Sequence, residues 1–364
     1  MTSETKIRVV IVDDSAFMRH ALRRMLERGP EIEILGAARD GEEGVAFVDR
    51  FAPDVVTMDV EMRGIGGLEA LRRIVARGPQ SPAVIMVSSL TTKDAQVTLD
   101  ALHIGAVDFI AKPPPGSGVL DIAALGDDLL AKVREFGSQR GRRRAKPPSP
   151  AAHRAPAGRS ECVAIGTSTG GPVALSRIVP RLPKNFPVPI VIAQHMPPGF
   201  TAALAERLDA SSQLDVSEGT DGMTLRAGAA VVAPAGQRAC VRRAGKTFAL
   251  ELAEAERGTL TPSVDALFAS LGESCKRGAL AVLLTGMGRD GVEGLRVVRA
   301  AGGYAVGQDE ASCIVYGMPR AAAEAGLIDY ICSLDELPRL LCSLTGLEVP
   351  LQSEEGSRPP LPGT

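Results

Sequence analysis

Tryptophan is absent from this 364-residue sequence, and aromatic residues make up only 3% of it. Hydrophobic residues still reach 45% and charged residues 23%, the balance of a globular protein, so the cores must be built from Val, Ile, Leu and Ala. The formal net charge of −2 argues against a protein that binds nucleic acid through its whole surface. A chain of this length accommodates two domains with separate cores.

Paired cysteines, a leader segment and long apolar runs are also missing. The six cysteines form no C-x-x-C pair and no cluster of metal-ligand spacing, which indicates reduced, mostly buried thiols. The first strand-like run, 7–12, has no basic and apolar leader before it. No apolar run approaches the roughly 20 residues that span a bilayer. We therefore expect a cytoplasmic protein without membrane insertion.

Short Val- and Ile-rich runs alternate with helical stretches from residue 7 to about 135, and again from 161 onward. This rhythm predicts an α/β protein with two doubly wound, mainly parallel sheets. We predict domains at 1–136 and 161–349, a disordered tail at 350–364, and a linker at 137–160 that carries seven Arg or Lys, four Pro and no acidic residue. The expected strands are 7–12, 33–37, 54–58, 83–87, 108–111, 162–165, 188–193, 229–233, 280–285 and 304–308.

Polar side chains follow four strands of the first domain. Because functional groups gather beyond the carboxyl ends of parallel strands, we expect these side chains to meet: Asp13, Asp14, Asp59, Ser88 and Lys112. Close carboxylates repel one another unless a hard cation such as Mg²⁺ lies among them, and the ammonium can pair with an incoming phosphoryl group. Each residue alone has a plainer interpretation, since the acidic pair can cap a helix and a strand-end lysine is often only solvated. Their combination predicts a magnesium-dependent phosphoacceptor site.

Residues 7–135 resemble a response-regulator receiver domain, a flavodoxin-like fold, through V-D-D-S at 12–15, M-D-V-E-M at 58–62, V-S-S at 87–89 and D-F-I-A-K-P at 108–113. The resemblance implies that Asp59 is the phosphoacceptor and that Asp13 and Asp14 help it hold Mg²⁺. It also implies that Ser88 and Phe109 are the switch residues and that Lys112 contacts the phosphoryl group. The family usually has Pro and Asp where this sequence has Arg63 and Gly66, which predicts a more mobile loop after the phosphoacceptor.

The strand ends of the second domain carry different chemistry. Ser168 lies in the glycine-lined turn G-T-S-T-G-G-P, His195 follows a later strand in A-Q-H-M-P, and Asp290 lies in G-M-G-R-D-G. Such a trio suits acyl transfer, because an imidazole can take the serine proton while a carboxylate orients the imidazole. Of the four histidines, only His195 lies in this domain. Two alternatives remain open: the glycine-rich turn can be a phosphate or dinucleotide cradle, and the other two residues can be a core histidine and a turn aspartate.

Residues 161 to about 345 resemble the catalytic domain of the chemotaxis protein-glutamate methylesterases, a larger Rossmann-like hydrolase domain. The stretches that carry the resemblance include I-G-T-S-T-G-G-P at 165–172, Q-H-M-P-P-G-F-T at 194–201, P-S-V-D at 262–265 and L-T-G-M-G-R-D-G at 284–291. By this resemblance Ser168 is the nucleophile, His195 the base and Asp290 the orienting acid, while Thr169 and Met287 make supporting and oxyanion contacts. The family usually has Arg where Thr261 stands.

The combined resemblance implies a phosphorylation-regulated hydrolase that demethylates glutamate methyl esters and deamidates glutamines on chemoreceptors, with no cofactor for catalysis. Its expected partners are those receptors and a histidine kinase, with no nucleic acid. We further expect the receiver to cover the strand ends of the second domain and so block a protein substrate. Two rivals are a receiver-controlled transcription regulator, which needs a recognition helix, and an esterase or amidase for small molecules.

Overall fold

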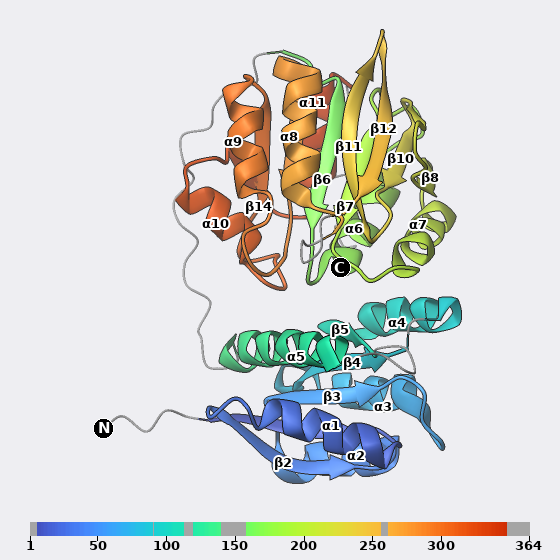
Figure 1. Cartoon of the computed structure of the whole chain (residues 1–364), viewed down its shortest axis with the longest axis vertical. Coiled ribbons are helices and arrows are strands. Elements are labelled where there is room, and N and C mark those ends of the chain that lie inside the picture. The colour runs from blue at the N-terminus through green and yellow to red at the C-terminus, as the bar shows by residue number, and fades with distance from the viewer. Residues whose placement is uncertain (1–5, 90, 113–118, 140–157, 256–260, 348–364) are drawn as a thin grey trace, which may run out of the picture.

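The computed structural model describes residues 6–89, 91–112, 119–139, 158–255 and 261–347. These residues form two α/β units that lie one above the other in Figure 1. The expected tail and most of the expected linker lie outside the described residues. Helix α5 continues to Gln139, so its last three residues fall within the range predicted as linker. No helix in the described part of the chain is both long and apolar enough to cross a membrane.

The first unit is built on a five-stranded parallel sheet with the order β2-β1-β3-β4-β5. Buried runs such as Val9–Val12 explain why these segments are strands, because both faces of the sheet are covered by helices. Helix α1 begins where the Ser15 hydroxyl accepts a hydrogen bond from Met18 N. The elements are β1 (Ile7–Val12), α1 (Ala16–Leu26), β2 (Ile32–Ala38), α2 (Gly41–Phe51), β3 (Val55–Asp59), α3 (Gly66–Val75), β4 (Ala83–Ser88), α4 (Thr92–Ile104), β5 (Asp108–Ala111) and α5 (Val119–Gln139).

The second unit has a seven-stranded parallel sheet with the order β15-β14-β13-β6-β7-β10-β8. Apolar residues of α6, α7 and α11 pack in one cluster and those of α8, α9 and α10 in another, so the sheet is covered on both faces. The main elements are β6 (Cys162–Thr167), α6 (Gly171–Ile178), β7 (Ile190–Gln194), α7 (Phe200–Ser211), β8 (Asp215–Glu218), β10 (Ala229–Val232), α8 (Val264–Cys275), β13 (Ala279–Leu283), α9 (Val292–Ala300), β14 (Tyr304–Gln308), α10 (Met318–Glu324), β15 (Tyr330–Cys332) and α11 (Leu337–Thr345).

The prediction of two doubly wound, mainly parallel sheets is confirmed, with one addition. A three-stranded antiparallel sheet of order β11-β12-β9 packs beside α8 and was not expected from the sequence. Its strands are β9 (Thr224–Leu225), β11 (Gln237–Ala244) and β12 (Thr247–Glu254). Three short 3-10 turns, η1 (Gly78–Gln80), η2 (Val179–Arg181) and η3 (Lys276–Gly278), complete the fold.

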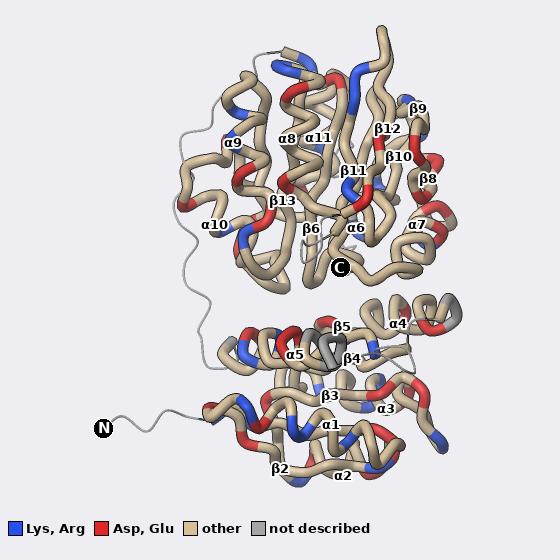
Figure 2. Tube along the Cα trace, viewed as in Figure 1, with Lys and Arg blue, Asp and Glu red and all other residues tan. Residues whose placement is uncertain are grey.

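The two units contact each other directly. Helix α4 of the first unit packs on α7 and α6 of the second, and α5 and the edge strand β5 also lie at the part of the first unit nearest the second (Figure 1). At the rim, Arg207 pairs with Asp100 at 2.5 Å and Gln96 donates to Glu206 at 3.1 Å. Figure 2 shows acidic and basic residues interspersed along both units. The carboxyl ends of the large sheet therefore face the first unit rather than open solvent.

Candidate functional site

The predicted acidic cluster of the first unit is assembled. One carboxylate oxygen each from Asp13, Asp14 and Asp59 lie within 4.8 Å of one another. The ammonium of Lys112 lies 2.8 Å from Asp59 Oδ2 and 3.2 Å from Asp13 Oδ2. Strands β1, β3 and β5 bring these groups together at the side of the sheet where the strand order reverses, between β1 and β3.

Burial determines the electrostatics of this cluster. Asp13 and Asp59 are almost fully buried, whereas Asp14 is exposed. Burial raises the pKa of Asp59 to about 6, although the Lys112 ammonium acts in the opposite direction. Three carboxylate oxygens, of which only that of Asp14 belongs to an exposed residue, are the kind of ligand that Mg²⁺ takes, with waters in its remaining positions. The residues present therefore fit a magnesium ion, which would offset the repulsion among the carboxylates.

The two residues that the resemblance implies as switch residues, Ser88 and Phe109, make different contacts. The Ser88 hydroxyl accepts a hydrogen bond from Thr98 at 2.8 Å. The ring of Phe109 is stacked on Phe200 of α7, with 4.7 Å between ring centroids and 13° between planes. The aromatic residue that the resemblance implies as a switch is thus part of the contact between the two units.

The loop after Asp59 departs from the family pattern at Arg63 and Gly66. Gly66 has a φ of +65°, a conformation that glycine adopts readily. A Cβ on Gly67, which the family pattern retains, would lie only 2.0 Å from Asp59 O. The close approach at this position explains why glycine is needed there, and helix α3 begins at the substituted residue Gly66 itself.

Three strand ends of the second unit are held together by backbone hydrogen bonds. Ser168 N donates to Thr285 O after β13, and His195 N donates to Thr167 O at the end of β6. Ser168 follows β6 and Asp290 follows β13, the two strands between which the strand order of the large sheet reverses. Crevices at such a reversal are the usual ligand sites of open α/β sheets.

The imidazole and carboxylate of this site are in direct contact. His195 Nε2 lies 2.8 Å from Asp290 Oδ2, and each side chain is 11% exposed. Asp290 also accepts hydrogen bonds from Val264 N and Asp265 N, the first two amides of α8. Burial opposes ionisation of Asp290, but the His195 contact and the two amides outweigh it and lower the pKa of this carboxyl. The group is therefore a stable anion that orients the imidazole.

Ser168 and His195 line one pocket of about 850 Å³ that lies between the two units. Among the described residues no hydrogen bond joins the Ser168 hydroxyl to the imidazole in this closed arrangement; catalytic contacts of this kind often tighten only when substrate is bound. Residues of both units form the wall: Asp108, Phe109, Ile110, Ala111, Lys112, Leu125, Asp128, Ala131, Lys132, Ser168, Thr169, Pro172, Gln194, His195, Met196, Pro197, Pro198, Thr261, Met287 and Gly288. The predicted supporting residues Thr169 and Met287, and the substituted position Thr261, are among them.

Sequence reasoning missed two further polar residues at this pocket. Gln194 is buried, and its Nε2 donates to Ser168 O and His195 O, both at 2.9 Å, so it links the backbones of the two residues. Asp108 of the first unit accepts a hydrogen bond from the Thr169 hydroxyl at 2.8 Å and lies 3.2 Å from the Lys132 ammonium. Gln194 could have been selected from the sequence because it directly precedes His195. Asp108 could not, because its contact with Thr169 depends on docking of the two units.

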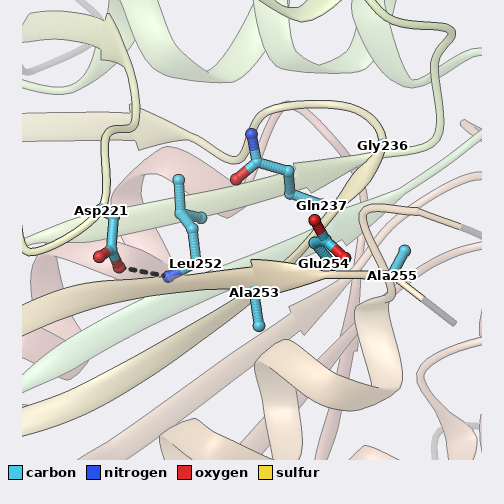
Figure 3. Close-up of a pocket in the computed structure, with 7 residues that line it drawn as sticks. All are labelled: Asp221, Gly236, Gln237, Leu252, Ala253, Glu254 and Ala255. Carbon is cyan, nitrogen blue, oxygen red and sulfur yellow. Dashed lines mark hydrogen bonds between the residues drawn. The ribbon is translucent and has the colours of Figure 1, made fainter.

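A second, open pocket of about 550 Å³ lies along β11 and β12 (Figure 3). Its two carboxylates belong to Asp221 and Glu254, and Asp221 accepts a hydrogen bond from Leu252 N at 2.9 Å. It shares no lining residue with the pocket between the units. None of the predicted site residues falls in it.

Fold and geometry together define a class of protein in which a receiver with an acidic phosphoacceptor-type cluster is docked on an α/β unit of serine-hydrolase type. Residues 9–122 match the response regulator receiver domain family, and residues 163–341 match the CheB methylesterase family. The chain belongs to the receiver-containing CheB methylesterase family.

Relatives of similar length support this membership. The protein-glutamate methylesterase/protein-glutamine glutaminase of Desulfitobacterium hafniense is 41% identical over 92% of this chain and 97% of its own length. That of Thermotoga maritima is 41% identical over 93% of this chain and 98% of its own length. The crystal structure of the Thermotoga maritima CheB methylesterase catalytic domain superposes with a TM-score of 0.50 and 40% identity, covering 51% of this chain and 98% of that one.

Proposed function

We propose that this protein hydrolyses glutamate methyl esters on chemoreceptors, with Ser168 as nucleophile, His195 as base and Asp290 as orienting acid. One observation carries the assignment: His195, which lines the same pocket as Ser168, is in contact with Asp290 at 2.8 Å, at the strand-order reversal of the large sheet. The names of the relatives supply the substrate class. The same chemistry accounts for glutamine deamidation, since only the leaving group differs, ammonia in place of methanol.

The reaction proceeds through two acyl transfers. His195 takes the hydroxyl proton of Ser168 as the oxygen attacks the γ-carbonyl, and the protonated imidazole then gives this proton to the departing methanol. Water, deprotonated by His195, attacks the acyl-enzyme, and the proton returns to Ser168 as glutamate leaves. Because Nε2 of the imidazole faces Asp290, Nδ1 is the nitrogen that exchanges the proton with Ser168.

The oxyanion of each tetrahedral intermediate needs hydrogen-bond donors. The N–H of Ser168 already donates a hydrogen bond to Thr285 O, and the N–H of Gly171 donates one to Ser168 O. We assign the role to the backbone N–H groups of Thr169 and Met287, two residues that line the same pocket as Ser168. Loss of one such donor typically costs about 3 to 4 kcal/mol of transition-state stabilisation.

Regulation follows from the position of the receiver. In this arrangement β5 and α5 of the receiver form one wall of the pocket that contains Ser168, so a helix of a receptor has no access to it. Phosphorylation of Asp59 by a histidine kinase, with Mg²⁺ held by Asp13, Asp14 and Asp59, would shift the equilibrium toward an open form through Ser88, Phe109 and Lys112. We propose a cytoplasmic location for this activity, in keeping with the expectation from the sequence.

Methanol release from radiolabelled methylated receptor tests the catalytic assignment. Ser168→Ala in the full chain is expected to lower the rate by at least about a thousandfold, because no other group can form the acyl-enzyme. Ser176→Ala is the matched control, since it removes a serine hydroxyl from the neighbouring helix α6. Equal rates for wild type and Ser168→Ala would remove the assignment.

Deletion of residues 1–140 tests the regulatory proposal. The catalytic fragment should release methanol faster than the unphosphorylated full chain, because the pocket wall formed by the receiver is gone. Parallel assays with a small ester distinguish an esterase for small molecules, which would favour the small ester over methylated receptor in both proteins. An unchanged or lower rate on receptor in a folded fragment contradicts autoinhibition.

A further inference from the structure

The amino ends of helices α8 and α9 are joined by reciprocal hydrogen bonds, in which a carboxylate from each end accepts from backbone amides of the other. Asp290, which directly precedes the N-cap residue Gly291 of α9, accepts hydrogen bonds from Val264 N and Asp265 N at the start of α8, at 2.8 and 2.9 Å. In return Asp265, in the first turn of α8, accepts from Gly291 N at 2.9 Å and Gly294 N at 2.8 Å at the start of α9. Each carboxylate therefore satisfies free amides of the other residue's helix.

These reciprocal hydrogen bonds set the orientation of the Asp290 carboxylate. Gly291, the next residue, has a φ of +101°, and its N–H is held by Asp265. The helices are also in close contact, since a Cβ on Gly294 would lie 2.5 Å from Asp265 O. A shift of Gly291 would thus carry Asp290 with it and change the 2.8 Å contact with His195.

We propose that Asp265 is a positioning residue for the reaction: by holding the amino end of α9 it sets the orientation of Asp290 toward His195. This inference rests on the proposed function, because it assigns a role through the proposed orienting acid. Asp265 is not among the described residues that line the pocket, and it makes no hydrogen bond with Ser168. On this proposal it therefore acts through Asp290 alone. Burial, and then the nearby Asp290 charge, raise the pKa of Asp265, as expected for two carboxylates held this close.

A merely structural helix cap would give a different pattern of kinetics. Loss of a cap lowers stability by about 1 kcal/mol wherever it occurs, whereas misorientation of a catalytic group lowers kcat and leaves KM unchanged. The chain offers a matched control in Ser263, whose hydroxyl caps α8 by accepting from Ala266 N and, within the part of the chain that the structure describes, makes no hydrogen bond with α9.

The experiment compares kcat and KM for methanol release by the phosphorylated full chain. Asp265→Ala is expected to lower kcat about 10- to 100-fold with KM changed less than about twofold. Asp265→Asn, which keeps an oxygen that can accept from Gly291 N and Gly294 N, should restore kcat to within about threefold of wild type. Ser263→Ala should lower the melting temperature and leave kcat within about twofold. Unchanged kcat in Asp265→Ala, or an equal loss in Ser263→Ala, overturns the proposal.

A double-mutant cycle excludes an effect that bypasses Asp290. In an Asp290→Ala background, Asp265→Ala should change kcat by less than about twofold, and a further tenfold loss would contradict the inference. If Asp265→Ala fails to fold, the comparison of Asp265→Asn with Asp265→Ser, which has a shorter acceptor, decides between the same two outcomes. Wild-type chain that releases no methanol indicates failure of the proposed function itself, whereas active wild type with fully active variants indicates failure of this inference alone.

Discussion

The Thr169 hydroxyl, next in sequence to the proposed nucleophile, donates a hydrogen bond to the carboxylate of Asp108 on the receiver at 2.8 Å. Both residues are buried, and Lys132 lies 3.2 Å from the same carboxylate. A buried hydrogen bond to a charged group stabilises an arrangement by about 1.5 to 3 kcal/mol, more than the exposed pairs at the rim of the interface. The docked receiver therefore not only covers the pocket but also binds the side chain of the residue next to the proposed nucleophile.

Asp108→Ala in the full chain should raise the unphosphorylated rate of methanol release about tenfold or more, because the closed arrangement loses its buried polar contact. The matched control is Asp100→Ala, which removes only the exposed pair with Arg207 and should change the rate by less than about threefold. After phosphorylation the two variants and wild type should have similar rates. A folded Asp108→Ala protein with an unchanged basal rate would show that this contact does not hold the domains closed.

Asp290→Asn is expected to lower kcat by about a thousand- to ten-thousandfold, since an amide no longer stabilises the charged imidazole or fixes its tautomer. Asp329→Asn is a suitable control, because Asp329 is another buried carboxylate of the same domain that accepts a backbone hydrogen bond, from Ala305 N. It should lower the melting temperature and leave kcat almost unchanged. Comparable kcat losses in both variants would mean that Asp290 has only a structural role.

Gly286→Ala should also impair catalysis without changing any titratable group. An added Cβ would lie 2.3 Å from the Met318 sulfur and 2.8 Å from Ser168 Cβ, so the nucleophile has to move. We expect at least a tenfold loss of kcat, as a displacement of this size disturbs a reactive geometry. Gly158→Ala, where an added Cβ meets nothing within 4 Å, serves as control. Full activity of Gly286→Ala would contradict the close packing at the nucleophile.

The free energy of unfolding of the magnesium-free protein should decrease as the pH rises from 4 to 6. Burial raises the pKa of Asp59 from 3.8 to about 6, so in this range the folded state holds a proton that the unfolded state has released. The free energy of unfolding then decreases with pH by at most about 3 kcal/mol, and Asp59→Asn removes this dependence. Asp40→Asn, which retains the cap of α2, is the control.

Magnesium should reverse this loss above pH 6, because it binds the ionised carboxylates of the folded receiver. At a hundredfold excess over its dissociation constant the gain is about 2.7 kcal/mol. Chemical denaturation with and without the ion measures both effects. A pH dependence that persists in Asp59→Asn, or a magnesium effect equal in that variant and wild type, would disprove the assignment.

The sequence predicted those parts of the fold that depend on local pattern. Buried runs of β-branched residues gave the parallel strands, and β1, β5 and β14 have the predicted bounds. The hairpin of β11 and β12 escaped prediction because only one face is buried, so arginines interrupt the apolar residues of Gln237–Ala244. The short strands β8 and β15 lie at the edges of the large sheet, where the apolar signal is weak.

The candidate site likewise has residues that the sequence predicts and contacts that it does not predict. Residues at strand ends, such as Asp59, Ser168 and His195, could be selected because parallel strands bring their carboxyl ends to one edge. The contact between Asp108 and Thr169 joins residues 61 positions apart in different units, and no local pattern encodes such docking. The reciprocal hydrogen bonds of Asp265 and Asp290 also depend on how two helices pack.

The rim contacts between Asp100 and Arg207 and between Gln96 and Glu206 would hardly hold two separate proteins together. Together with the buried contact between Asp108 and Thr169 they hold the two units closed here because both partners belong to one polypeptide, and covalent connection gives each an effective concentration on the order of millimolar. The fraction of closed molecules is then independent of how much protein is present. A cell that makes ten times more of the enzyme obtains ten times the resting activity, without any change in how strongly each copy is restrained.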